Sequence, residues 1–146
     1  MAFRKKSLGA CIAKIFRLQR LAAEPRAHAL GIRESQIPFL AFILESPGIN
    51  QDELSRQYFI DKGATARQTA KLEEQGLIER VVDPDNRRKK RLYPTSKALT
   101  LGPDFYGMLD GLNDTFLAGF SEAEKEQLLL LLDKVSVNML KPSINE

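Results

Sequence analysis

The sequence predicts a mainly α-helical α+β fold with one small β-hairpin, and three observations lead to this prediction. Apolar residues recur with helical spacing on both sides of a central region. Residues 81–93 combine β-branched and aromatic residues with turn-forming residues between them. The length of 146 residues suits one domain that can bury a core. We therefore expect a single domain over residues 1–146.

The predicted hairpin carries a run of five consecutive cations, residues 87–91. Val81-Val82 favours a strand, Asp83-Pro84-Asp85-Asn86 is typical of a turn, and Leu92-Tyr93 can form the returning strand. The cations are then expected on a rigid loop at the hairpin tip, although the formal net charge of the whole chain is only +3. This pattern predicts an anionic partner. For a basic run taken alone, a solvated loop or a sorting signal is the alternative.

Two short helices with their own capping residues precede the hairpin. Asn50 is placed to cap the first, in a capping box with Glu53. Asp61 is placed to cap the second, over residues 62–75, and Gly76 can end it in a left-handed conformation. Helix, turn, helix and hairpin in this order predict a winged helix-turn-helix, an arrangement that binds DNA.

Further helices are expected before this region. A broad apolar stripe runs through residues 8–21, and Pro25 marks a kink or a break. The next helix begins near Ser35, where Pro38 is tolerated because N–H groups in a first turn have no intrahelical acceptor.

Two helices are expected after the hairpin. Thr95 caps the first, which is bent at Gly102-Pro103, and Ser121 with Glu124 forms a capping box for the last. Between residues 128 and 137 the last helix is apolar around most of its circumference, which implies burial on more than one side. Since a chain of this size has little other material to cover it, a subunit interface is predicted. Packing within the monomer is the alternative.

Residues 48–95 carry the most specific pattern. Its parts are Gln51-Asp52-Glu53-Leu54-Ser55, Ile60-Asp61-Lys62, Leu72-Glu73-Glu74-Gln75-Gly76-Leu77-Ile78-Glu79-Arg80, and Asp83-Pro84-Asp85-Asn86-Arg87-Arg88. With these segments the chain resembles the MarR family of bacterial winged-helix transcriptional regulators, and residues 31–36 and 121–124 also fit that family. Two positions differ, because the family usually has Asp-Arg in place of Asn86-Arg87 and Leu-Thr in place of Pro94-Thr95.

The resemblance implies a transcriptional regulator, most often a repressor, that binds double-stranded DNA as a homodimer. Residues 33–95 would form the DNA-binding winged helix-turn-helix, and residues 1–32 and 96–146 the interleaved dimerisation helices. The half-sites of such a dimer lie about 34–36 Å apart, so a pseudo-palindromic operator is expected. The resemblance also implies release from DNA by a small aromatic or phenolic effector. The candidate effector-binding residues are Phe16, Phe39, Phe42 and Phe105, with ordinary core packing as the alternative.

Helical spacing sorts the residues of the second helix in the motif. Toward the domain lie Ile60, Thr65, Thr69 and Leu72, and outward lie Lys62, Ala64, Arg67, Gln68 and Lys71. We expect Arg67 to contact guanine, Gln68 adenine, and the lysines phosphate. By resemblance, Arg88 would enter the minor groove. The predicted DNA contacts are Gln51, Lys62, Ala64, Thr65, Arg67, Gln68, Lys71, Arg87, Arg88, Lys89 and Arg91.

The sequence does not favour catalysis, a cofactor or a membrane span. It has one cysteine, Cys11, and one histidine, His28, which excludes an internal disulfide and a Cys/His zinc site. It has no Gly-rich phosphate loop, no H-E-x-x-H and no G-x-S-x-G. The longest apolar run, residues 128–132, is far shorter than the ~20 residues of a membrane span. We expect a cytoplasmic protein that is not an enzyme and binds no metal or cofactor.

Two other functions stay open. One branch of the MarR family senses peroxides through a cysteine in the first helix, where Cys11 lies. That branch uses nearby tyrosines to activate the thiol, whereas the three tyrosines of this chain are distant from Cys11 in the sequence. A buried, hydrophobic Cys11 is therefore expected.

Alternatively, the winged helix is a protein-interaction module or the basic hairpin holds RNA. A regulator would prefer one duplex with an inverted repeat over mixed duplex and single strands by orders of magnitude.

Overall fold

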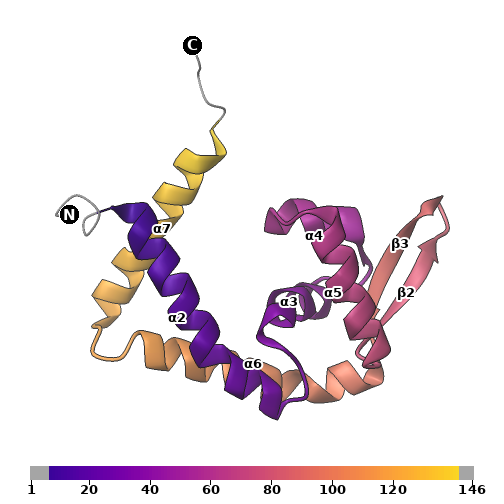
Figure 1. Cartoon of the computed structure of the whole chain (residues 1–146), viewed down its shortest axis with the longest axis horizontal. Coiled ribbons are helices and arrows are strands. Elements are labelled where there is room, and N and C mark those ends of the chain that lie inside the picture. The colour runs from indigo at the N-terminus through magenta and orange to yellow at the C-terminus, as the bar shows by residue number, and fades with distance from the viewer. Residues whose placement is uncertain (1–6, 142–146) are drawn as a thin grey trace. The chain divides into compact units, whose positions relative to one another are not determined.

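The computed structural model describes residues 7–141 and is mainly helical with one small sheet, which confirms the predicted fold class (Figure 1). The elements, in chain order, are α2 (Leu8–Ala29), the 3₁₀ turn η1 (Glu34–Gln36), α3 (Ile37–Glu45), β1 (Ile49–Asn50), α4 (Gln51–Tyr58), α5 (Lys62–Glu74), β2 (Ile78–Asp83), β3 (Asn86–Pro94), α6 (Ser96–Phe116) and α7 (Glu122–Leu140). They form two compact units, the first ending at Leu109 and the second beginning at Asp110, so α6 contributes to both.

The sheet is antiparallel with the strand order β1-β3-β2. Two residues of β3 are paired on both sides: Leu92 lies opposite Ile49 and Arg80, and Arg91 lies opposite Asn50 and Val81. Beyond this short three-stranded part, β2 and β3 continue as a hairpin that projects from the helices of the first unit (Figure 1). The register shifts between Val82 and Asp83, just before the turn. Irregularities of this kind commonly mark the end of a paired segment.

The predicted capping residues are confirmed. Asn50 Oδ1 accepts a hydrogen bond from the backbone N–H of Glu53 at 2.9 Å, and Asp61 Oδ1 accepts from Ala64 at 2.7 Å. At Asn50 the expected capping box is only half formed, since the structure shows this bond but no return bond from the Asn50 backbone N–H to the Glu53 side chain. Gly76 has φ 72°, the left-handed conformation that ends α5. The local sequence thus fixes where α4 and α5 begin and where α5 ends.

The N-terminal helices differ from the prediction at two places. Of the kink or break expected at Pro25, the break is wrong, because α2 continues through it to Ala29. Pro25 lacks the N–H that an interior residue would donate, and the helix ends one turn later. The following helix does not begin near Ser35 in α-helical form. A 3₁₀ turn comes first, and α3 starts at Ile37 with Pro38 in its first turn, as expected.

The first unit has one hydrophobic core. Leu40 and Ile43 of α3 and Leu54 of α4 are fully buried, and so are Leu92 of β3 and Phe105 of α6. These side chains come from α3, α4, the sheet and α6, and Leu72 of α5 is buried with them. The α4–α5 pair is therefore held by packing that involves α3, the sheet and α6 together.

The second unit contains the end of α6 and all of α7. Ser121 and Glu124 form the predicted capping box at the start of α7. Between Leu129 and Leu132 every leucine of α7 is exposed, and Met139 is 67% exposed. Near the other end of the chain, α2 likewise exposes Ile15 and Leu21, the latter at 72%. Exposed apolar side chains in such number are unusual for a monomer.

Candidate nucleic-acid interface

Buried hydroxyl groups fix α5 against α4. The Ser55 hydroxyl donates to Thr65 Oγ1 at 2.8 Å, and both residues are buried. One turn further along α5, the buried Thr69 hydroxyl lies 3.3 Å from Gln51 Oε1. Hydrogen bonds between buried groups are directional, so they set the rotation of α5 about its axis. That rotation determines which side chains of α5 face outward.

The outward face of α5 is polar and positively charged. Lys62, Arg67 and Lys71 are exposed, and Ala64 and Gln68 are half-buried. Lys62 also lies 3.7 Å from Asp52 of α4, but an exposed ion pair of this kind contributes little and leaves the lysine available. All five residues lie on the side that the sequence predicted.

Two predicted DNA contacts of α5 differ in the structure. Thr65 was among the predicted DNA contacts, but its side chain is fully buried and its hydroxyl is bonded to Ser55 and to the carbonyl of Asp61. It cannot reach a ligand at the surface. For Gln68, Oε1 is buried without a hydrogen-bond donor. The amide must change rotamer before both of its polar atoms can read an adenine.

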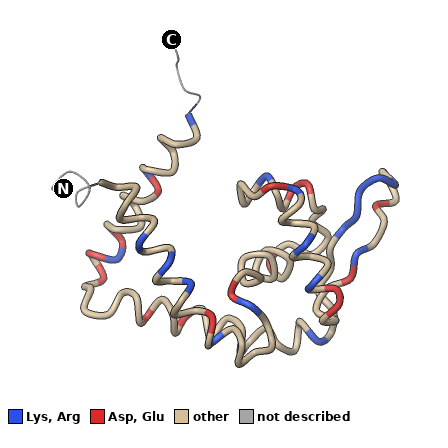
Figure 2. The backbone as a smooth tube through the Cα atoms, in the orientation of Figure 1, with Lys and Arg blue, Asp and Glu red and all other residues tan. Residues whose placement is uncertain are grey.

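The cations of the hairpin lie along a strand, which corrects the prediction of a basic loop at the tip. All five belong to β3, which begins at Asn86, so the returning strand is longer than Leu92-Tyr93 (Figure 2). The predicted turn Asp83-Pro84-Asp85-Asn86 is confirmed, with only Pro84 and Asp85 between the two strands. The reason is local: Asp83 Oδ1 accepts from the backbone N–H of Asp85 at 2.9 Å and closes the turn early.

The end of the hairpin is further stabilised by Arg91. Its Nε lies 3.2 Å from Asp83 Oδ2, and its Nη2 lies 3.9 Å from Asp85. The hydrogen bond from the Asp85 backbone, followed by the Arg91 guanidinium, lowers the pKa of the Asp83 carboxyl. Arg91 is thus partly neutralised, whereas Arg87, Arg88 and Lys90 are exposed.

A polar cleft of about 200 Å³ separates the start of α4 from the hairpin. It is lined by Asn50, Gln51, Asp52, Arg80, Arg88, Lys89 and Lys90. Arg80 and Lys90 were not predicted as contacts. Strand alternation could have predicted Lys90. Side chains two residues apart on a strand share a face, and Arg88, two positions before Lys90, was already a predicted contact. Arg80 lies opposite Leu92 in the sheet, a pairing that the sequence does not display.

Arg80 also joins α5 to the hairpin. Its Nη2 donates to Glu73 Oε1 at 2.9 Å, and Glu73 Oε2 accepts from the Arg80 backbone N–H at 3.3 Å. The hydrogen bond from Arg80 is the main cause of a lowered pKa of Glu73. Glu73 is therefore ionised at neutral pH, and the two elements that carry the cations are linked by a charged pair.

An apolar cavity of about 270 Å³ lies elsewhere in the first unit. Its lining consists of Phe16, Gln19, Arg20, Ala23, Glu34, Ile37, Pro38, Ala41, Tyr58 and Leu109. Of the four predicted effector-binding phenylalanines, only Phe16 is among these residues. The prediction is wrong for Phe39 and Phe105, which are buried in the hydrophobic core.

Two of the predicted phenylalanines, Phe39 and Phe42, contact Tyr58, which lines the cavity. Phe42 packs edge-on against Tyr58, with ring centroids 4.6 Å apart, and the Phe39 ring stacks on the same tyrosine. Burial raises the pKa of the Tyr58 hydroxyl. Tyr58 therefore presents a neutral hydroxyl-bearing ring to the cavity at physiological pH.

Cys11 is exposed, so the expectation of a buried cysteine is wrong. Its thiol is accessible, as the alternative of redox sensing requires. His28 is exposed on α2. Within residues 7–141 no three His, Cys, Asp or Glu side chains are grouped to hold a metal ion. None of the described helices is both long and apolar enough to cross a membrane.

Comparison with known sequences finds a family and a relative that are transcriptional regulators. Residues 32–90 match the MarR family. Over 110 residues the chain is 34% identical to YybA, an HTH-type transcriptional regulator of Bacillus subtilis strain 168, and the match covers 75% of this chain and 73% of that protein.

Two solved structures have the same fold. A MarR transcriptional regulator from Methanosarcina mazei Go1 is 29% identical, with a TM-score of 0.86 and coverage of 91% of this chain and 96% of that one. A putative MarR family regulator from Listeria monocytogenes, solved with a 26mer DNA, is 30% identical, with a TM-score of 0.85 and coverage of 92% and 89%.

Proposed function

Because this chain belongs to the MarR family of transcriptional regulators, we propose that it is a sequence-specific repressor that binds double-stranded DNA as a homodimer. We also propose that the operator is pseudo-palindromic and that a small molecule releases the protein from it. The observation that carries it is the exposed cationic face of α5 beside a hairpin strand with five consecutive cations. Such a pair of elements matches a major groove and an adjacent minor groove.

Each element has a distinct role in this proposal. Arg67 on α5 reads a base edge, since a guanidinium can donate two hydrogen bonds to guanine O6 and N7. Lys62 and Lys71 contact phosphates on either side. Arg88 enters the minor groove, and Arg87 and Lys89 neutralise the backbone. A related structure holds a 26mer DNA, which supports the choice of duplex DNA over RNA or a protein partner.

A second copy of the same chain is the proposed partner of the exposed apolar helices. The exposed apolar side chains of α2 are Leu8, Ile12, Ile15, Phe16, Leu18 and Leu21, and those of α7 are Leu129, Leu130, Leu131, Leu132, Val137, Met139 and Leu140. Burying such surface between two copies removes it from water at a gain of roughly 25 cal/mol per Å². A two-fold dimer would place two copies of α5 about one DNA turn, 34–36 Å, apart.

The effector site that we propose is the cavity bounded by Phe16, Ile37, Pro38 and Tyr58. Its walls are largely apolar, and Arg20 and Glu34 are the charged residues among them. An aromatic or phenolic molecule fits this combination. The ligand would favour a dimer geometry that does not match the operator, and DNA affinity would fall by population shift.

The proposed function is tested by selection and competition. The wild-type protein is used to select duplexes from a random library at a stated salt concentration, because affinity depends on salt. The selected duplex is then competed with mixed duplex and with each single strand. We expect an inverted repeat with affinity about 10³-fold or more above the mixed duplex. Equal affinity for all competitors would exclude a sequence-specific regulator.

The hairpin cations are expected to act differently from one another. Arg88→Ala should weaken specific binding most, above all where the minor groove is A·T-rich. Lys89→Ala should weaken all duplexes by a smaller, similar factor, and it should flatten the slope of log K against log salt by about one unit per contact, or two per dimer.

Arg91→Ala is the comparison on the same strand, because Asp83 already pairs with this arginine in the free protein. It should change the salt slope less than Lys89→Ala does. Fluorescence anisotropy at several salt concentrations measures all three variants. Unchanged affinity and slope in all three would make the hairpin a solvated loop.

A further inference from the structure

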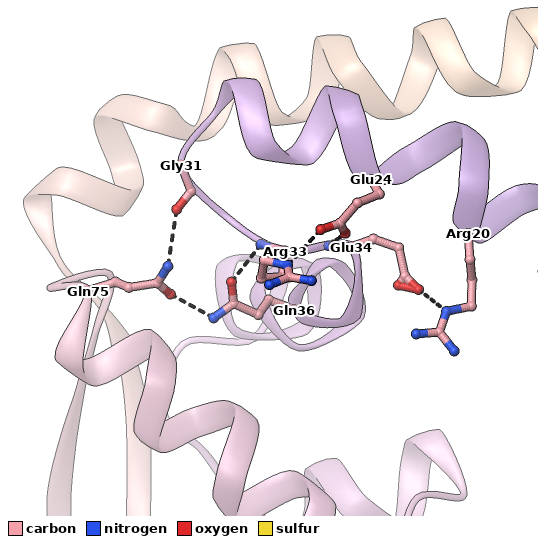
Figure 3. Close-up of polar contacts among 7 residues, drawn as sticks. All are labelled: Arg20, Glu24, Gly31, Arg33, Glu34, Gln36 and Gln75. Carbon is pink, nitrogen blue, oxygen red and sulfur yellow. Dashed lines mark hydrogen bonds and ion pairs between the residues drawn. The ribbon is translucent and has the colours of Figure 1, made fainter.

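A buried glutamine side chain contacts the C-terminal end of α5. Gln36, in the 3₁₀ turn η1, is 1% exposed, and its Nε2 donates to Gln75 Oε1 at 2.6 Å (Figure 3). Gln75 is the C-cap residue of α5. Its own Nε2 donates to the backbone carbonyl of Gly31 at 3.1 Å, just after α2. The two amides thus bridge the C-terminal end of α5 and the segment between α2 and α3.

That segment is itself tied to α2. The remaining amide atom of Gln36, Oε1, accepts from the Arg33 backbone N–H at 2.8 Å. The Arg33 side chain donates to Glu24 of α2 at 2.6 Å, and Glu24 also accepts from the Glu34 backbone N–H at 2.9 Å. These bonds lower the pKa of the Glu24 carboxyl, chiefly the one from Glu34. A continuous set of hydrogen bonds therefore runs from α2 to α5 (Figure 3).

The start of α6 holds the same end of α5 from another direction. Lys97 Nζ donates to the backbone carbonyl of Gln75 at 2.7 Å, and the Thr95 hydroxyl donates to the carbonyl of Gly76 at 2.6 Å. The last carbonyls of a helix otherwise have no partner in the helix. Here the carbonyls of the C-cap residue Gln75 and of the following Gly76 receive donors from Lys97 and Thr95, so the end of α5 is held relative to both α2 and the start of α6.

We propose that Gln36 and Gln75 are positioning residues for DNA recognition, which set the direction of α5 relative to α2. The proposal rests on the dimeric DNA-binding function above, because two copies of α5 must lie one DNA turn apart. Packing alone leaves α5 free to tilt slightly, since apolar contacts are not directional. The two side-chain amides, with their hydrogen bonds satisfied, favour a single direction of α5 relative to α2. A small tilt at this anchored end shifts the side chains that read the bases.

The test compares operator spacings. The probes are an inverted-repeat duplex selected by the wild-type protein and the same duplex with one base pair inserted or deleted between the half-sites. The variants are Gln36→Leu, Gln75→Leu and the double variant, which keep side-chain bulk and remove the hydrogen bonds. Gln57→Leu, at an exposed position of α4, is the matched control. Active protein is quantified by titration, so partial unfolding does not count as weaker binding.

We expect either single variant to lose about 10-fold affinity for the selected spacing and to discriminate less between the spacings. The double variant should lose less than the sum of the two single losses, because both changes remove the shared Gln36–Gln75 hydrogen bond. Gln57→Leu should change neither quantity.

Equal losses at all three spacings, or no loss, would overturn the proposal and leave the pair a purely structural role. If Gln36→Leu does not fold, as judged by circular dichroism, the half-exposed Gln75 provides the test by itself. A wild-type protein that selects no inverted repeat would instead overturn the proposed function.

Discussion

Replacing Leu132 with glutamate should convert the protein to a monomer and lower its operator affinity by about 10²–10⁴-fold, the advantage that linked half-sites usually provide. Leu132 lies in the apolar part of α7 and is 43% exposed. In the proposed dimer a glutamate there would be buried without a partner, which is strongly unfavourable. Sedimentation velocity at micromolar concentration and titration of the selected operator measure the two effects.

Lys134→Gln is the control for this substitution. It changes the net charge by the same amount on the same helix but removes no apolar side chain. It should leave both the sedimentation coefficient and the operator affinity unchanged. The dimer proposal is contradicted if the wild-type protein is a stable monomer, or if the Leu132→Glu protein remains a dimer.

Arg67→Ala should cost about 1–3 kcal/mol per half-site and relax the preference at one base position in each half-site. Arg67 is exposed on α5, and its Nη1 lies over the first turn, 3.2 Å from the position that a Cβ on Gly63 would occupy. The lack of a side chain at Gly63 leaves room for the guanidinium there. The side chain therefore lies beside the helix surface, from which it can extend to a base.

Selection from a random library by the Arg67→Ala protein, compared with selection by the wild type, measures this effect. Lys71→Ala serves as the comparison, because a lost phosphate contact weakens all sequences alike and flattens the salt dependence. Arg67→Lys should restore little of the base preference, since an ammonium cannot donate in the bidentate manner of a guanidinium. An unchanged preference in Arg67→Ala would remove this residue from the set that reads the bases.

The local architecture of this protein follows from interactions between residues that are close in the sequence. Asn50, Asp61 and Ser121 each cap a helix through a backbone N–H three residues away. A bond of that span depends only on neighbouring residues, so it can be predicted from them. The left-handed Gly76 and the outward face of α5 follow from equally short-range rules. The winged helix-turn-helix was predictable for this reason.

Which of the predicted side chains are accessible depends on how the elements pack. Phe39 and Phe105 were expected to line an effector site but are buried in the core, whereas Cys11 was expected to be buried and is exposed. The helical period gives the direction of a side chain but does not say which elements cover it.

The tertiary structure also decided which distant residues meet. Gln36 and Gln75 are 39 positions apart, and Arg80 meets Leu92 only through the register of the sheet. Such contacts depend on how the whole chain packs, because no short segment contains both partners. The link between α2 and the end of α5, and the cleft beside the hairpin, therefore became visible only in the folded chain.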